Sequence, residues 1–289
     1  MRGGQWQTLY LARGLRERGE SVRVLARGEF YAAAVAQRFE VSPAGVPGMW
    51  RWSRWADIVH AQDARSHTLA AVVSRCPLVA SRRVAFPIGR DAASRWKYRR
   101  ARRLIAISRH VATALGAAGV PQDRIAIVPD GVPAPESPVA AFSARPLQFL
   151  ALPTGDPMKG DDLVQGAAAL GGFGVTWTEH LVDDLRRARV FIYVSRSEGL
   201  GSAALLAMAN GTAVIASNEG GLKEIVEHEQ TGLLVENNPD AIAAAMSRLA
   251  ADQDLAQSLA ASGAERVRRH FSVDRMVAGT IEVYRSVLG

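Results

Sequence analysis

The sequence has a single cysteine, Cys76, and only three lysines among its 35 basic residues. One cysteine excludes an internal disulfide and agrees with a reducing compartment. No apolar run approaches the roughly 18 residues that a membrane-spanning helix needs. The N-terminal MRGGQWQTLY lacks the apolar core of a signal peptide, so export is not expected. We therefore expect a cytoplasmic protein.

The chain is long enough for two domains of ordinary size, with 289 residues of which 48% are hydrophobic. Its net charge of +7 is carried almost entirely by arginine. Three explanations compete for the densest basic segment: a solvated face, a surface that attracts anionic lipid headgroups, or a nucleic-acid patch. No nucleic-acid-binding motif supports the third. The segment, with Trp96 and Tyr98 interleaved, contains Arg82, Arg83, Arg90, Arg95, Lys97, Arg99, Arg100, Arg102, Arg103 and Arg109.

The most informative stretch runs from Val190 to Val226. It reads as an apolar strand, a glycine turn, an Ala/Leu helix and a second apolar strand, which is typical of a parallel sheet covered on both faces. Loops that follow parallel strands lie at the same edge of the sheet, so residues 197–201 and 218–221 should be neighbours. Gly199 and Gly201 would then offer backbone N–H groups to a phosphate beside the Glu198 carboxylate. A purely structural turn is the alternative for so short a motif.

The whole stretch, VFIYVSRSEGLGSAALLAMANGTAVIASNEGGLKEIV, closely resembles the donor-binding segment of retaining family 4 glycosyltransferases of the GT-B fold. Its usual form is a Ser-x-x-Glu-Gly-Phe-Gly turn, a Glu-Ala-Met helix, a Pro-Val-Ile-Ala strand and a Gly-Gly-x-x-Glu-Ile-Val loop. Two further strings resemble parts of the family's N-terminal domain: GGQWQTLYLARGLRERGESVRVLARG and IAISRHVATALGAAGVPQDRIAIVPDGV.

The resemblance implies an α/β fold of two Rossmann-like domains whose parallel sheets face each other across a cleft. We place the N-terminal, acceptor-side domain at 1–133, a proline-rich linker at 134–146, and the nucleotide-sugar domain at 147–271. A terminal helix, 272–289, would cross back to the first domain. In the family a central strand precedes the glycine pair Gly3-Gly4, and here it is absent. Either the protein starts upstream of Met1, which we favour, or the sheet has lost a strand.

On the donor side, the resemblance assigns Glu198 to the donor sugar and Lys159 to the diphosphate, although no arginine occupies the loop ALPTGDPM before it. From the loop alone, Lys159 would be an ordinary surface lysine. The family's second carboxylate, which holds the ribose, is replaced by Leu206. The remaining donor-side residues are Ser197, Gly199, Leu200 and Gly201 in the glycine turn, Gly220 and Gly221 in the second loop, and Thr178 near the base.

On the acceptor side, His60 matches the first histidine of the family's His-x-His pair, and Gln62 replaces the second. We predict that His60, like Glu198 on the donor side, is catalytic and that Asp63 lines the cleft with the glycine pair, Gly3 and Gly4. Arg82 and Arg83 follow a strand and could bind a phosphate or carboxylate in bidentate fashion, with a surface salt-bridge role as the alternative.

The resemblance implies transfer of a sugar from a UDP-, GDP- or ADP-sugar to a glycan or lipid-linked acceptor of the cell-envelope polysaccharide or lipopolysaccharide type. The nucleotide sugar would be a co-substrate, with no resident cofactor or metal. Contact with the anionic inner leaflet of a membrane would bring a lipid-linked acceptor within reach, and nucleic acid is not expected as a partner. The alternatives are a catalytically weakened nucleotide-sugar-binding protein, or a nucleotide-sugar epimerase or hydrolase of the same fold.

Overall fold

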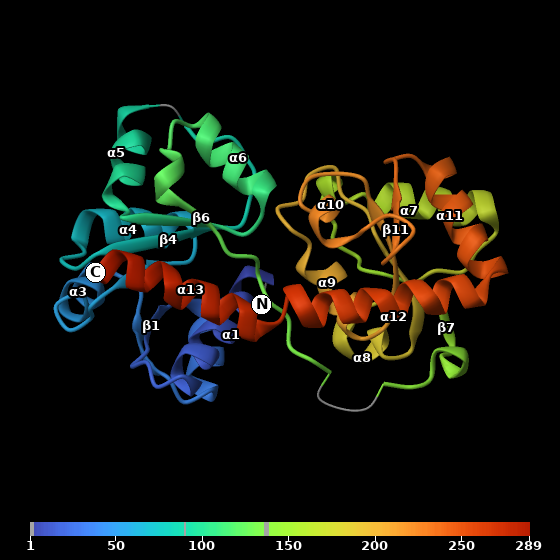
Figure 1. Ribbon diagram of the computed structural model, residues 1–289, viewed down its shortest axis with the longest axis horizontal. Coiled ribbons are helices and arrows are strands. Elements are labelled where there is room, and N and C mark those ends of the chain that lie inside the picture. Colours follow the sequence, from blue (N-terminus) through green and yellow to red (C-terminus); the bar gives the residue numbers. More distant parts are fainter. Residues whose placement is uncertain (1–2, 90, 136–138) are drawn as a thin grey trace. The chain divides into compact units, whose positions relative to one another are not determined.

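The computed structural model describes residues 3–89, 91–135 and 139–289, which form two compact units (Figure 1). The first unit combines the chain up to Gly131 with the last segment, Val273–Gly289. The second runs from Val132 to Ser272. Within the segment 134–146, residues 136–138 lie outside the described part of the chain. Phe142 and Arg145 of the same segment are buried within the second unit.

The first unit alternates short parallel strands with helices. Its elements are α1 (Gly3–Glu17), β1 (Arg23–Ala26), α2 (Gly28–Ala36), β2 (Glu40–Pro43), α3 (Val46–Trp52), β3 (Val59–Ala61), α4 (Ala64–Val73), β4 (Leu78–Arg82), α5 (Ala92–Arg100), β5 (Arg103–Ala106), α6 (Arg109–Ala117), a 3₁₀ turn at Gln122–Arg124, β6 (Ile125–Ile127) and α13 (Val273–Leu288).

The strands of this unit form two separate parallel sheets, β1-β2 and β3-β4-β5-β6. No described strand pairs with both β1 and β3. Helix α1 joins the two sheets. Its Leu9 packs in one apolar cluster with β1 and α2, while Leu11 and Leu15 pack in another with β4, β5 and α13. A Cβ on Gly14 would come within 2.5 Å of Val277 Cγ2, so glycine permits the close packing of α1 on α13.

The prolines and glycines of residues 41–54 are typical of a short strand followed by a loop, but these residues form β2 and the helix α3. Gly45 is the extended N-cap, and Pro47 lies in the first turn, where its missing N–H costs nothing. Met49 and Trp52, three positions apart, bury one face of α3. Helices α4 and α5 had no assignment from the sequence.

The second unit is a five-stranded parallel sheet with helices on both faces. Its elements are a 3₁₀ turn at Phe142–Ala144, β7 (Leu147–Ala151), a 3₁₀ turn at Pro157–Lys159, α7 (Asp161–Gly171), β8 (Thr176–Trp177), α8 (Leu181–Leu185), β9 (Ala188–Tyr193), α9 (Ser202–Ala209), β10 (Ala213–Ser217), α10 (Leu222–Ile225), β11 (Leu233–Val235), α11 (Pro239–Ala251) and α12 (Gln253–His270).

The strand order of this sheet is β11-β10-β9-β7-β8. Helices α7 and α11 pack together on one face, and α9 packs against α12 on the other (Figure 1). Because both faces are covered, Phe191, Val214 and Ile215 are fully buried, which explains the unbroken apolar runs of β9 and β10. The fold class is therefore as predicted: α/β, with parallel sheets.

The buried Arg145 fixes the start of the second unit. Its guanidinium donates to the carbonyls of Ala188 at 2.9 Å, Gly211 at 2.7 Å and Asn210 at 3.0 Å. Two of these carbonyls follow the C-terminal end of α9, where unpaired carbonyls and the negative end of the helix dipole favour a cation. Arg145 therefore ties the segment before β7 to the turn between α9 and β10.

Candidate functional site

The sheet of the second unit reverses its winding between β7 and β9. From β7 the chain first adds β8 on one side, and then adds β9, β10 and β11 on the other. In open α/β sheets, ligands bind beyond the carboxyl ends of the strands at such a reversal. The loops after β7 and β9, which contain Lys159 and Glu198, flank this point.

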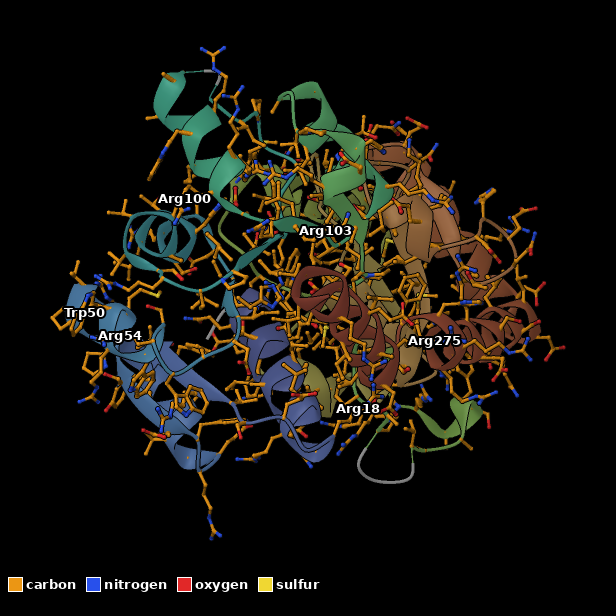
Figure 2. The ribbon with its side chains drawn as sticks, turned by 60° about the vertical axis from the view of Figure 1, so that its left-hand side comes forward. Arg18, Trp50, Arg54, Arg100, Arg103 and Arg275 are labelled. Carbon is orange, nitrogen blue, oxygen red and sulfur yellow. The ribbon has the colours of Figure 1, made fainter. Side chains whose placement is uncertain are left out.

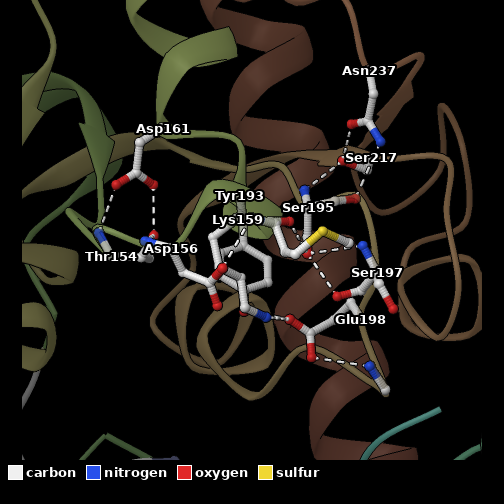
Figure 3. A network of polar contacts seen from close by, with 12 residues as sticks. Thr154, Asp156, Lys159, Asp161, Tyr193, Ser195, Ser197, Glu198, Ser217 and Asn237 are labelled. Atoms are coloured by element: carbon white, nitrogen blue, oxygen red, sulfur yellow. Dashed lines mark hydrogen bonds and ion pairs between the residues drawn. The ribbon is translucent and has the colours of Figure 1, made fainter. Parts of the chain in front are cut away.

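Lys159 and Glu198 meet directly between these two loops (Figure 3). Lys159 Nζ lies 2.6 Å from Glu198 Oε2, and Tyr193 Oη donates to the same carboxylate oxygen at 2.7 Å. The other oxygen, Oε1, accepts from the backbone N–H of Gly199 at 3.0 Å. Burial and the adjacent Glu198 carboxylate raise the pKa of Tyr193, which keeps the phenol protonated as a donor. The carboxylate is thus held by three donors.

The two glycine loops contact each other backbone to backbone, as predicted. The N–H of Gly221 donates to the carbonyl of Glu198 at 3.0 Å. A Cβ on Gly221 would lie 2.1 Å from the Gly199 oxygen, and one on Gly220, whose φ is +51°, would lie 2.4 Å from the Glu198 oxygen. No other residue type fits at these positions without moving the loop that carries Glu198.

The turn before α9 presents backbone donors toward the same edge. Gly201 has a φ of +109°, and a Cβ there would lie 2.6 Å from Leu222 Cδ2. Among the described residues, no side chain caps α9 at this N-cap. Leu200 is buried and anchors the turn, while the carbonyl of Ser197 accepts from Ser195 Oγ at 2.8 Å. A helix start in which the backbone N–H groups have no side-chain cap suits an anionic ligand.

Polar side chains hold both loops in place (Figure 3). Asp161 at the start of α7 accepts from the backbone N–H groups of Thr154 at 2.8 Å and Gly155 at 3.0 Å. Ser217 Oγ accepts from the Ser195 N–H at 2.8 Å and donates to Asn237 Oδ1 at 2.6 Å. The loops after β7, β9, β10 and β11 therefore form one hydrogen-bonded assembly.

Arg196 is a residue of this assembly that the sequence reasoning missed. Its guanidinium pairs with both oxygens of Asp162, at 3.1 and 2.7 Å, and also donates to the carbonyl of Pro157. Its backbone N–H donates to the Met158 carbonyl at 2.8 Å. An arginine from the β9 loop therefore braces the turn that carries Lys159, in a region where the β7 loop supplies no arginine of its own.

Thr178 and Leu206, the two remaining donor-side positions, differ in burial and in their hydrogen-bond partners. Thr178 is buried; its N–H donates to the Ala151 carbonyl at 3.0 Å and its hydroxyl donates to Asp184 at 2.5 Å. Thr178 thus anchors the end of β8 beside β7. Leu206 is half-buried on α9, and its carbonyl accepts from Asn210 Nδ2 at 2.8 Å.

In the first unit, His60 has both ring nitrogens engaged. Nδ1 lies 2.7 Å from Tyr284 Oη and Nε2 lies 2.8 Å from Ser81 Oγ, so the ring joins β3 to β4 and to α13. Burial, together with the Arg83 charge, lowers the pKa of His60 to about 3. His60 is therefore neutral at physiological pH, and its catalytic role stays a prediction.

Arg83 lies against Gln62 and Asp130 at the carboxyl end of β4. It donates to Gln62 Oε1 at 2.9 Å and to Asp130 Oδ1 at 3.1 Å. Burial raises the pKa of Asp130, against the opposing effect of Arg83. Because Asp130 is almost fully buried, the Arg83 charge is needed to compensate its carboxylate.

The other acceptor-side candidates also have local partners. Arg82 donates to Tyr98 Oη at 2.9 Å and to the Phe86 carbonyl. Asp63 caps α4 by accepting from the N–H groups of Arg65 and Ser66, both at 2.8 Å. Gly3 and Gly4 begin α1, and a Cβ on Gly4 would lie 3.5 Å from Arg83 Cδ. Gly4, Arg83 and Gln62 are thus close together, while Asp63 and Arg82 are occupied by structural contacts.

An Asp-x-Asp sequence occurs at residues 252–254, where it begins α12. Asp252 is the N-cap and accepts from the Leu255 N–H at 2.8 Å. Within the described ranges, no group of three or more His, Cys, Asp or Glu side chains is arranged to hold a metal ion.

Comparison with known proteins decides the family. Residues 1–134 match the family described as Glycosyltransferase Family 4, and residues 172–266 match Glycosyl transferases group 1. The chain belongs to glycosyltransferase family 4. Alpha-maltose-1-phosphate synthase of Mycolicibacterium smegmatis is 38% identical over 127 residues, which cover 39% of this chain and 33% of that protein. The lipopolysaccharide core biosynthesis mannosyltransferase LpcC of Rhizobium leguminosarum is 34% identical over 105 residues, 36% of this chain and 30% of LpcC. The match spans a third or less of these two relatives.

Solved structures show the same fold along nearly the whole chain. Anabaena HepE in complex with UDP and glucose superposes with a TM-score of 0.83 at 17% identity, covering 99% of this chain and 96% of HepE. Sucrose-phosphate synthase of Thermosynechococcus elongatus gives a TM-score of 0.70 at 18% identity, covering 97% of this family 4 chain and 93% of the synthase. The GT-B fold is thereby established. None of the described helices has the length and apolarity to cross a membrane.

Proposed function

We propose that this family 4 protein transfers a sugar from a nucleotide-sugar donor to an acceptor hydroxyl with retention of anomeric configuration. One observation carries the proposal: a lysine and a glutamate meet at the reversal of the second sheet, 2.6 Å apart, beside two interlocked glycine loops. A cation with backbone donors suits a diphosphate, and a carboxylate held in place suits sugar hydroxyls.

In the proposed reaction, the bond between the anomeric carbon and the diphosphate oxygen breaks, and the acceptor oxygen bonds to the same face of that carbon. The acceptor proton passes to the leaving diphosphate. Lys159 and the amides of Leu200 and Gly201 stabilise the negative charge that develops on the leaving group. Glu198 orients the donor sugar through its hydroxyls, and Tyr193 fixes the carboxylate for that purpose.

The relatives suggest where to look for the substrates. Structures of HepE contain UDP or UDP-glucose, so uridine nucleotides are the first donors to test, followed by GDP- and ADP-sugars. LpcC is named for lipopolysaccharide core biosynthesis, and another relative for phosphatidylinositol monomannoside mannosyl transfer. A lipid-linked or cell-envelope acceptor, reached from the cytoplasmic side of a membrane, is therefore our proposal for this chain.

Acceptor dependence tests the proposal. Nucleoside diphosphate release is measured from UDP-, GDP- and ADP-sugars with and without membrane extract, using Glu198→Ala as the inactive control. Release that rises with extract supports transfer. Release that is equal with and without extract means hydrolysis, and nucleotide binding without any release means a binding protein.

A further inference from the structure

The outer helices of the first unit carry exposed tryptophans. Trp50 on α3 is 44% exposed and Trp55, just beyond α3, is 46% exposed. Val72 on α4 is 65% exposed, and α4 packs against α3. Together with Arg51, Arg54 and Arg75, these residues form what we call the tryptophan–arginine surface. Large aromatic side chains gathered at a surface signal an interaction site.

Arginines hold the tryptophan rings of this surface in place. The guanidinium carbons of Arg54 and Arg75 lie 5.1 and 5.7 Å from the centre of the Trp50 ring. Arg23 lies 4.0 Å from the Trp55 ring centre. Figure 2 shows Trp50 and Arg54 beside each other at the outer edge of the unit. Cation–π contacts order the exposed rings before a partner arrives, which lowers the entropy cost of docking.

The segment of the chain that contains this surface is strongly basic. Between residues 41 and 122 the sequence has fourteen Lys and Arg residues and only three Asp and Glu residues, a net charge of +11. The whole chain has a net charge of +7, so the remainder is net acidic. The stretch 44–56, which contains α3, has no acidic residue. The partner of this surface is therefore anionic.

The basic surface continues from α4 onto α5. Arg100 Nε donates to the Ala71 carbonyl of α4 at 3.1 Å. Helix α5 has no buried residue, and its Trp96 is 47% exposed beside Lys97, Arg99 and Arg100. The pattern of α3 thus recurs on α5: exposed tryptophan, arginine neighbours and no acid within the helix.

We propose that the surface formed by α3, α4 and α5 docks on a bilayer that contains anionic lipids. Tryptophan prefers the headgroup level of a bilayer, where its ring is half in an apolar layer and its N–H stays wet. Arginine pairs with lipid phosphates, and exposed Val72 enters the same layer. A nucleic acid or a soluble anionic glycan would use the charge but would leave the exposed Val72 unmatched. This inference does not depend on the donor site, because docking needs no nucleotide.

The test is co-sedimentation of the full chain with vesicles of phosphatidylcholine, with or without phosphatidylglycerol. We expect the wild type to bind only the vesicles with phosphatidylglycerol, and the variant Trp50→Ala/Trp55→Ala to bind them about tenfold more weakly. Arg54→Gln/Arg75→Gln should weaken binding by a similar factor. The matched controls are Leu170→Ala, an exposed leucine of the second unit, and Arg187→Gln/Arg269→Gln, which remove the same charge from that unit.

Folding of each variant is checked by its melting curve, and a single Trp50→Phe variant, which keeps an aromatic ring, should retain most of the binding. The proposal is overturned if the variant Trp50→Ala/Trp55→Ala binds like the wild type, or if the wild type binds vesicles without phosphatidylglycerol equally well. It is also overturned if RNA or dextran sulfate binds in a tryptophan-dependent manner while vesicles do not bind.

Discussion

Substituting either residue of the Lys159–Glu198 pair should distinguish binding of the donor's diphosphate from binding of its sugar. In the protein without donor, the pair is 2.6 Å long, with side-chain exposures of 27% and 14%. A partly buried pair of this kind is worth about 1–2 kcal/mol, between exposed and fully buried examples. Lys159 gives up some of this contact when it turns to a diphosphate. Glu198→Gln removes the carboxylate that competes with the diphosphate for Lys159, and it keeps the shape of the side chain.

We therefore expect Glu198→Gln to bind a nucleoside diphosphate as well as the wild type or up to about tenfold more tightly, since 1.4 kcal/mol is a factor of ten. The same variant should bind the complete nucleotide sugar more weakly, because the charged acceptor for the sugar hydroxyls is lost. Lys159→Met loses a charge-assisted hydrogen bond of about 1.5–3 kcal/mol and should weaken both ligands by about 10- to 150-fold.

Isothermal titration calorimetry measures the affinity of both variants, Glu198→Gln and Lys159→Met, for the nucleoside diphosphate and for the complete nucleotide sugar. The matched control is Lys223→Met, which removes a lysine from α10 of the same unit. If Glu198→Gln weakened the nucleoside diphosphate as much as Lys159→Met does, the carboxylate would act on the diphosphate side, and the assignment of Glu198 to the sugar would be refuted.

Three further predictions follow from other contacts. Tyr193→Phe removes one of three donors to Glu198 and should lower kcat more than it raises KM; an unchanged kcat would mean that Tyr193 only packs. Leu206→Glu places a carboxylate on α9 where the family resemblance implies a ribose contact, and should tighten nucleotide binding in a titration; no gain would show that the pocket recognises the ribose in another way. The pKa values of His60 and His67 are lowered to about 3 and about 4, so each is neutral when folded and takes up a proton on unfolding. Their contribution to stability is present above the unfolded value of 6.5 and is lost as pH falls towards 3, by at most about 1.4 kcal/mol per pH unit for each. Denaturant titrations from pH 7 to pH 4 should therefore show that the free energy of unfolding falls less for His60→Gln than for the wild type. Equal falls in the two proteins would contradict the buried, neutral state of His60.

The donor side was the most predictable part of the fold. Solid apolar runs define β9 and β10, and the rule that parallel strands share a loop edge brings their glycine loops together, as the Gly221–Glu198 hydrogen bond confirms. Sequence patterns were sufficient here because the two contacting loops belong to consecutive strand–helix–strand units. The partner of Glu198 was harder to predict. Tyr193 ends an apolar strand, and nothing in the sequence pattern indicates that its hydroxyl donates to the carboxylate.

The first unit shows why the rest was less predictable. Gly45 and Pro47 indicated a loop, but tertiary burial of Met49 and Trp52 stabilises a helix there instead. Arg83 could be read from the sequence as a phosphate ligand. Its partners, Gln62 and Asp130, are 21 and 47 positions away, and only the fold reveals them. Arg145 looked like part of a linker because its acceptors are carbonyls, which leave no trace in the sequence.

The most direct measurement is the change in melting temperature on adding UDP-, GDP- and ADP-sugars to the wild type and to Gly221→Ala. A Cβ at position 221 would lie 2.1 Å from the Gly199 oxygen and so displace the loop that holds Glu198. We predict that at least one sugar nucleotide raises the melting temperature of the wild type, and that the same ligand has little effect on the folded variant. If no sugar nucleotide stabilised the wild type, or if the variant responded equally, a donor site between the β7, β9 and β10 loops would be contradicted.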